Sequence, residues 1–239
     1  EYALVFRNHS YGYEVQATAK LFIPNVRFLI CEDGEIPENV PNYIMTSCEK
    51  TANTITCDVE IQLGTSHVKR SCGILSTEHP TTAPDVKNSE VEYALCRLLY
   101  ETLREMTNYT PPWGLLTGIR PVRKVIQLLD EGYTPEEAAR KLQERFLISD
   151  EKMQLALDTA LIQQPILPHS AKEIGLYISI PFCPTRCSYC SFVSHSMDSA
   201  MQLIPDYVEY LCREIEILGG IIRRYGLHVQ SVYIGGGTP

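Results

Sequence analysis

Apolar and polar residues alternate most regularly between residues 54 and 63. Every second side chain in this stretch is apolar, and the side chains between them are polar. A period of two residues is typical of a strand with one face in the core and one in water. The turn sequence "LGTS" follows and leads into residues 67–72, so a hairpin is predicted here. The apolar set is Ile55, Cys57, Val59, Ile61 and Leu63.

Shorter apolar runs precede this hairpin. Residues 3–7 ("ALVFR") and 26–31 ("VRFLIC") predict two strands, and residues 11–22 between them predict a helix. Together with the hairpin they predict an antiparallel sheet covered by one helix. We therefore expect a small α/β domain over residues 1–75.

Residues 76–170 have a helical pattern with clear start signals. A helix with an apolar stripe is expected after residue 89, and three more helices after the Pro/Gly-rich loop "TPPWGLLTGIRP". The segment "QQPILPHS" (163–170) has two prolines and is typical of a linker. The start signals are Ser89 with Glu92, Pro121, Thr134 with Pro135 and Glu137, and Ser149.

The last two of these helices have the layout of a DNA-binding helix-turn-helix. Acidic side chains outnumber basic ones between residues 133 and 160, and a recognition helix there would be repelled by phosphate. Packing within the protein is therefore the favoured interpretation.

Residues 171–239 predict a strand, a helix and a second strand. "LYISI" (176–180) alternates as a strand, and "VQSVYI" (229–234) ends in the turn "GGGTP". A right-handed crossover of this kind is the first βαβ unit of a (β/α) barrel or an open sheet. One such unit cannot cover both faces of its strands, so we expect an N-terminal fragment with an incomplete barrel. The apolar stripe of the helix is Ile204, Val208, Leu211, Ile215, Leu218, Ile222 and Tyr225.

Composition narrows the class of protein. A net charge of -8 argues against a nucleic-acid surface that neutralises phosphate. No apolar run reaches the length of a membrane span, and no signal peptide opens the sequence, which indicates the cytoplasm. Nine cysteines are an odd number for a disulfide framework, so reduced thiols or metal ligands are expected.

Three of the cysteines stand on one short loop after the strand at 176–180. Cys183, Cys187 and Cys190 have the spacing C-x3-C-x2-C, and thiolates select zinc or iron–sulfur clusters. A structural zinc ion would need a fourth ligand, for which His195 is the nearby candidate. A 4Fe-4S cluster held by three thiolates leaves one iron open for a substrate or cofactor.

The loop and the glycine turn resemble those of the radical S-adenosylmethionine superfamily. "LYISIPFCPTRCSYCSF" (176–192) with "GGGTP" (235–239) is similar, more closely, to the oxygen-independent coproporphyrinogen III oxidase (coproporphyrinogen dehydrogenase) family. The preceding domain and "PPWGLLTGIRP" resemble, more loosely, its dehydrogenase-like branch with an extra N-terminal domain. The close resemblance covers residues 175–239.

This resemblance implies a set of site residues. Cys183, Cys187 and Cys190 would ligate three irons of a 4Fe-4S cluster, and S-adenosyl-L-methionine would bind the fourth. Contacts to that cofactor would come from Tyr177, Tyr189, Gly237 and Thr238.

The resemblance also implies a reaction. A reduced cluster would cleave S-adenosylmethionine, and the 5'-deoxyadenosyl radical would take hydrogen from a propionate of coproporphyrinogen III. Loss of carbon dioxide would yield protoporphyrinogen IX for haem biosynthesis. A flavodoxin- or ferredoxin-type electron donor would supply the electron, and we expect the present stretch alone to be inactive.

Two positions depart from the family pattern. Ser179 occupies a position at which the family motif commonly has histidine. Phe192 occupies a position at which established dehydrogenases have a fourth cysteine. Two alternatives therefore stay open beside the enzyme. One is a haem-binding carrier or chaperone without oxidase activity, and the other is a non-catalytic N-terminal docking fragment.

Overall fold

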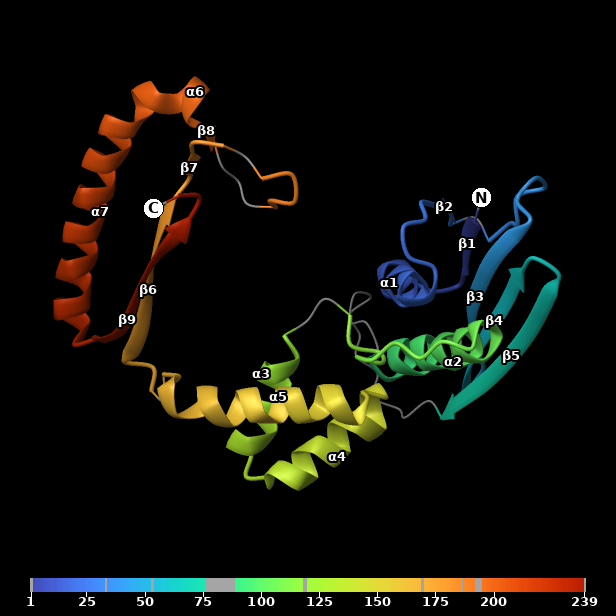
Figure 1. Ribbon diagram of the computed structural model, residues 1–239. Coiled ribbons are helices and arrows are strands. Elements are labelled where there is room, and N and C mark those ends of the chain that lie inside the picture. The colour runs from blue at the N-terminus through green and yellow to red at the C-terminus, as the bar shows by residue number, and fades with distance from the viewer. Residues whose placement is uncertain are drawn as a thin grey trace. The chain divides into compact units, whose positions relative to one another are not determined.

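The computed structural model describes residues 2–32, 34–52, 54–75, 89–117, 120–168, 170–185, 187–191 and 195–238. The chain divides into two compact units, Glu1–Ile162 and Gln163–Pro239, whose elements are labelled in Figure 1. The predicted α/β class is confirmed, since both units combine helices and strands.

A five-stranded sheet in the order β2-β1-β3-β4-β5 forms the first unit's scaffold. Strand β1 pairs in parallel with both β2 and β3, whereas β3, β4 and β5 pair antiparallel. The strands are β1 (Tyr2–Arg7), β2 (Phe28–Cys31), β3 (Asn42–Lys50), β4 (Thr54–Leu63) and β5 (Ser66–Leu75).

The prediction of a purely antiparallel sheet is wrong. Helix α1 (Gly12–Phe22) connects β1 to β2, and a helical crossover returns the chain parallel to the strand it left. Strand β3 was not predicted because Ile44, Met45 and Thr46 are buried in succession. A central strand covered on both faces lacks the alternation that makes β4 easy to recognise.

Two helices cover the core face of this sheet, where one was predicted. Helix α1 and helix α2 (Ser89–Thr107) pack with the strands in one hydrophobic cluster. The predicted cap at Ser89 lies outside the described side chains. The fully buried members of this cluster include Leu4, Val15, Val59, Ile61, Leu95, Leu99, Tyr100 and Leu103.

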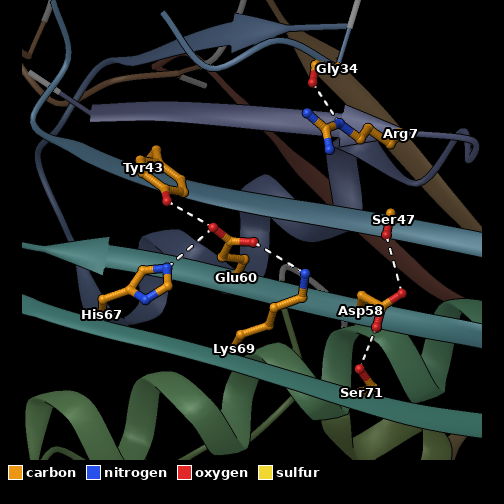
Figure 2. A network of polar contacts seen from close by, with 9 residues as sticks. All are labelled: Arg7, Gly34, Tyr43, Ser47, Asp58, Glu60, His67, Lys69 and Ser71. Atoms are coloured by element: carbon orange, nitrogen blue, oxygen red, sulfur yellow. Dashed lines mark hydrogen bonds and ion pairs between the residues drawn. The ribbon is translucent and has the colours of Figure 1, made fainter. Parts of the chain in front are cut away.

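The opposite face of the sheet carries polar side chains (Figure 2). Glu60 accepts a hydrogen bond from the Tyr43 hydroxyl at 2.9 Å and lies 3.2 Å from His67 Nε2 and 3.5 Å from Lys69 Nζ. Burial opposes ionisation of Glu60, but the hydrogen bonds from His67 and Tyr43 and the charge of Lys69 outweigh it. The pKa of this carboxyl is therefore lowered.

Three further helices complete the first unit: α3 (Pro121–Asp130), α4 (Pro135–Phe146) and α5 (Asp150–Gln163). Their predicted starts are confirmed. Pro121 occupies the first turn of α3, Thr134 and Glu137 form a reciprocal capping box on α4, and Ser149 Oγ accepts the Lys152 N–H at 3.3 Å.

The loop before α3 is held against the end of α4. The Leu115 N–H donates to the Phe146 carbonyl at 2.7 Å, and the Ser149 N–H donates to the Pro112 carbonyl at 3.0 Å. Gly114 has φ +56, and a Cβ there would clash with the carbonyl oxygens of Phe146 and Leu147. Glycine is required at this position on both counts.

The second unit contains the predicted strand, helix and strand. Strands β6 (Glu173–Ile180) and β9 (His228–Gly236) pair in parallel, and α7 (Ile204–Tyr225) connects them. Its described strands form two-stranded sheets without barrel closure. The remaining elements are the short helices η1 (Gln164–Ile166), α6 (Met197–Ala200) and η2 (Met201–Leu203) and the strands β7 (Phe182–Cys183) and β8 (His195–Ser196).

Helix α7 buries none of its residues. Val208, Ile215 and Leu218 of its apolar stripe are 49%, 43% and 38% exposed, and Val232 and Ile234 of β9 are likewise 57% and 52% exposed. Within the described residues, no helix is both long and apolar enough to cross a membrane.

Candidate cluster-binding loop

The three-cysteine loop begins where β6 ends. Cys183 belongs to β7 and is half-buried, as is Cys190, whereas Cys187 is exposed. The Cys190 N–H donates to the Cys187 carbonyl at 3.1 Å, which closes a turn between these two cysteines. All nine cysteines lie within the described ranges, and none forms a disulfide.

The thiols are not gathered around a common centre. Among the described residues, no three Cys, His, Asp or Glu side chains are close enough to hold a metal ion. Arg186 and Phe192–Ser194 of this region lie outside the description. The structure thus places the donors on one short loop but does not show a ligand set, either for a cluster or for zinc with His195.

The glycine turn after β9 lies against the start of this loop. The Gly237 N–H donates to the Ile180 carbonyl at 2.6 Å, and the Thr238 N–H donates to the Phe182 carbonyl at 2.8 Å. A Cβ on Gly237 would lie 3.0 Å from Cys183 Sγ and would collide with the Phe182 carbonyl oxygen. Backbone of the turn is therefore in direct contact with the first cysteine.

The two predicted tyrosines lie in different surroundings. Tyr177 stands opposite Tyr233 in the register of β6 and β9, and their rings stack at a centroid distance of 5.4 Å. Both rings are more than half exposed, while Tyr189 is 88% exposed. The structure brings Gly237 close to Cys183 and Thr238 to Phe182, but leaves the Tyr189 side chain directed into solvent.

Aromatic contacts fix the loop to the beginning of α7. Phe182 packs edge-on against Tyr207 at 5.2 Å and lies 6.4 Å from the ring of His195. The Tyr207 hydroxyl donates to the Ser179 carbonyl, and the His195 N–H donates to the Pro181 carbonyl at 2.7 Å.

Tyr207 and Tyr233 were missed by the sequence reasoning. Tyr233 has a usable signal, because it is an aromatic residue two positions before the glycine turn on the strand paired with Tyr177. Tyr207 has none in the sequence, since its contact to Ser179 joins residues 28 positions apart.

The donor chemistry of the loop fits an iron–sulfur cluster. Iron–sulfur clusters are held by cysteine thiolates, and all three loop cysteines are unbridged and at least partly exposed. Because residue 237 is a glycine, no side chain stands between the glycine turn and the Cys183 thiol.

Several known proteins are similar to this chain. The oxygen-independent coproporphyrinogen-III oxidase-like protein HemZ of Bacillus subtilis is 30% identical over 225 residues, which are 91% of this chain and 43% of HemZ. The heme chaperone HemW of Escherichia coli is 36% identical over 66 residues, 28% of this chain and 17% of HemW. Anaerobilin synthase of Escherichia coli O157:H7 is 34% identical over 70 residues, 29% of this chain and 15% of that protein.

Each alignment covers only part of the similar protein. The chain spans less than half of HemZ and less than a fifth of HemW and anaerobilin synthase. No family model matches the chain, and no solved structure matches it.

Proposed function

Because the chain belongs to the oxygen-independent coproporphyrinogen-III-oxidase-like family of radical S-adenosylmethionine proteins, we propose that its second unit contains the cluster and cofactor site of that family. Cys183, Cys187 and Cys190 would hold a 4Fe-4S cluster. When bound, the cluster and S-adenosylmethionine supply a one-electron reduction that generates a hydrogen-abstracting radical.

The observation that supports this proposal most directly is the contact of Gly237 with Cys183. The hydrogen bonds from Gly237 and Thr238 to Ile180 and Phe182 fix this turn at the carboxyl end of β6. A glycine backbone without Cβ allows close approach of a ligand. The pair is thus suited to bind the methionine end of the cofactor beside the first thiol, with Tyr177 and Tyr189 as further contacts.

The proposed reaction is the oxidative decarboxylation of coproporphyrinogen III to protoporphyrinogen IX. It would take place in the cytoplasm, with an electron donor of the flavodoxin or ferredoxin type. We propose a domain at 171–239, the start of a partial barrel, preceded by a sheet domain at 1–75 and a helical region at 76–170.

A haem carrier is the second candidate. Phe192 replaces the fourth cysteine of established dehydrogenases, and similar proteins include several named heme chaperones. A carrier would keep the three cluster cysteines and bind haem without decarboxylating a porphyrinogen.

One experiment separates the two candidates. The full-length natural protein is reconstituted anaerobically with iron and sulfide and supplied with a chemical reductant, S-adenosylmethionine and coproporphyrinogen III. Vinyl-bearing product detected by mass spectrometry would support the oxidase. Stoichiometric haem binding without any vinyl product would contradict the oxidase and favour the carrier.

A further inference from the structure

Three cysteines of the first unit form a row across the sheet, away from the cluster loop in sequence. Cys57 on β4 stands directly opposite Cys48 on β3, and Cys72 on β5 stands directly opposite Cys57. The Cys48 and Cys57 sulfurs are 3.6 Å apart. Both side chains belong to the hydrophobic core under α1 and α2.

This pair can be bridged with little change of the backbone. Directly opposed residues of antiparallel strands have Cα atoms about 4.5–5.5 Å apart, within the range of roughly 4.4–6.8 Å found in disulfides. The sulfurs must approach from 3.6 Å to about 2.05 Å, which side-chain rotation can supply.

Only one member of the pair is open to a small molecule among the described residues. A pocket of about 220 Å³ is lined by Cys48, Lys50, Ile55 and the turn at residues 8–11, whereas Cys57 is fully buried. A water molecule occupies roughly 30 Å³ of liquid, so the pocket has room for a hydroperoxide at Cys48. Cys57 lies behind it.

The two thiols also differ in protonation. The hydrogen bond from Cys57 lowers the pKa of Cys48, and the same contact raises the pKa of Cys57 to about 12. Either sulfur can be the donor in this contact, and the lowered pKa of Cys48 favours a thiolate at the sulfur that faces the pocket.

We propose that Cys48 is an oxidation site for hydroperoxides and that Cys57 is its resolving thiol. The Cys48 sulfur attacks one peroxide oxygen, the O–O bond breaks, and an alcohol (or water, from hydrogen peroxide) leaves as Cys48 becomes a sulfenic acid. The Cys57 sulfur then attacks the Cys48 sulfur, the S–O bond breaks, and water leaves with the Cys57 proton. Two thiols lose two electrons and the peroxide gains them.

The site goes beyond the proposed radical chemistry and is independent of it. Its residues belong to Glu1–Ile162, and the cluster loop belongs to Gln163–Pro239. A failure to bind a cluster would leave this proposal untouched, and the converse also holds.

Peptide mapping tests the proposal on the reduced 239-residue chain. The chain is treated with a small excess of hydrogen peroxide, remaining thiols are blocked with N-ethylmaleimide, and the digest is analysed by mass spectrometry without reduction. A Cys48–Cys57 linked peptide is expected. In Cys57→Ser the link is lost, and dimedone, which reacts with sulfenic acids, is expected to label the oxidised Cys48 but not Cys96.

Two variants serve as controls. Cys72→Ser leaves Cys48 and Cys57 in place, and Cys212→Ser removes an exposed thiol of α7. Both should keep the Cys48–Cys57 link. Oxidation of Cys212 in the wild type without any Cys48–Cys57 link would overturn the proposal. So would dimedone labelling of Cys57 in a Cys48→Ser variant whose circular dichroism matches the wild type.

Discussion

Gly237 is a single residue on which the proposed site depends. Its amide holds the end of β9 to Ile180, and the missing Cβ is what allows contact with Cys183. The three loop cysteines were predicted because their spacing is short and local, and Gly237 was predicted through the family resemblance of the turn "GGGTP". The sequence could not point to Tyr207, whose contacts with Ser179 and Phe182 arise only when distant segments meet.

A methyl group at Gly237 should disrupt cofactor binding. In Gly237→Ala the new Cβ must displace the Phe182 carbonyl or the Cys183 side chain, so we expect S-adenosylmethionine affinity to fall about tenfold or more, equivalent to about 1.4 kcal/mol. Calorimetric titration of the reconstituted protein measures this. Gly220→Ala, on α7 with no atom within 4 Å of the added Cβ, should bind as the wild type does; equal affinity of both variants would refute the role of Gly237.

Glu60 makes stability depend on pH. Its folded-state pKa is lowered, so its stabilising contribution is present above the unfolded pKa and is lost as pH falls through the folded pKa. Glu60→Gln should therefore lose stability at neutral pH and show a shallower decline on acidification than the wild type. Urea unfolding across acidic pH tests this, with the exposed Glu144→Gln on α4 as control. Parallel curves for the wild type and Glu60→Gln would contradict the account.

At the scale of elements, the sequence predicted helix starts better than strand pairing. A cap is a local hydrogen-bond pattern, and Thr134, Pro121 and Ser149 act as predicted. Pairing is non-local. The parallel addition of β1 beside β3 arises only in the folded unit, where Ile44 is buried under α1 and α2 and Met45 is buried on the other face with Ala3 and Val5. No short window of sequence reveals this.

The capping box of α4 should be measurable in stability. Thr134→Ala removes the acceptor for the Glu137 N–H, and loss of such a cap costs about 1 kcal/mol. Chemical denaturation gives the free energy of unfolding. Thr159→Ala is the matched control, because Thr159 lies within α5 and bonds the Leu155 carbonyl in its own helix. We expect that control to be near neutral; a loss as large as that of Thr134→Ala would contradict the assignment.

Gly114 fixes the loop before α3 to the end of α4. In Gly114→Ala the left-handed backbone costs about 1–2 kcal/mol, and the clash with Phe146 and Leu147 adds to it. Gly64→Ala isolates the backbone part, since Gly64 has φ +58 and no atom within 4 Å of a Cβ. Thermal unfolding should show a clearly larger loss for Gly114→Ala. Equal losses would show that the contact contributes nothing.

At the scale of the whole molecule, the two compact units carry separate chemistry. The first has the larger core and the Cys48–Cys57 pair, and the second has the cluster loop on a strand–helix–strand unit. The parallel pairing of β6 and β9 was predictable from the sequence. The spacing of apolar residues changes there from that of a strand to that of a helix and back, and two strands joined by a helix pair in parallel. The sequence also predicted the start of a (β/α) barrel, and the described strands of this unit form two-stranded sheets without barrel closure.

Cluster binding by the loop is the central claim, and anaerobic reconstitution with iron and sulfide tests it most directly. We predict sulfur-to-iron charge-transfer absorbance and about four irons per chain for a 4Fe-4S cluster. Both should be lost in Cys187→Ala and kept in Cys212→Ala, which removes an exposed cysteine of α7 outside the loop. Absence of the absorbance in the wild type, or its persistence in Cys187→Ala, would contradict the account.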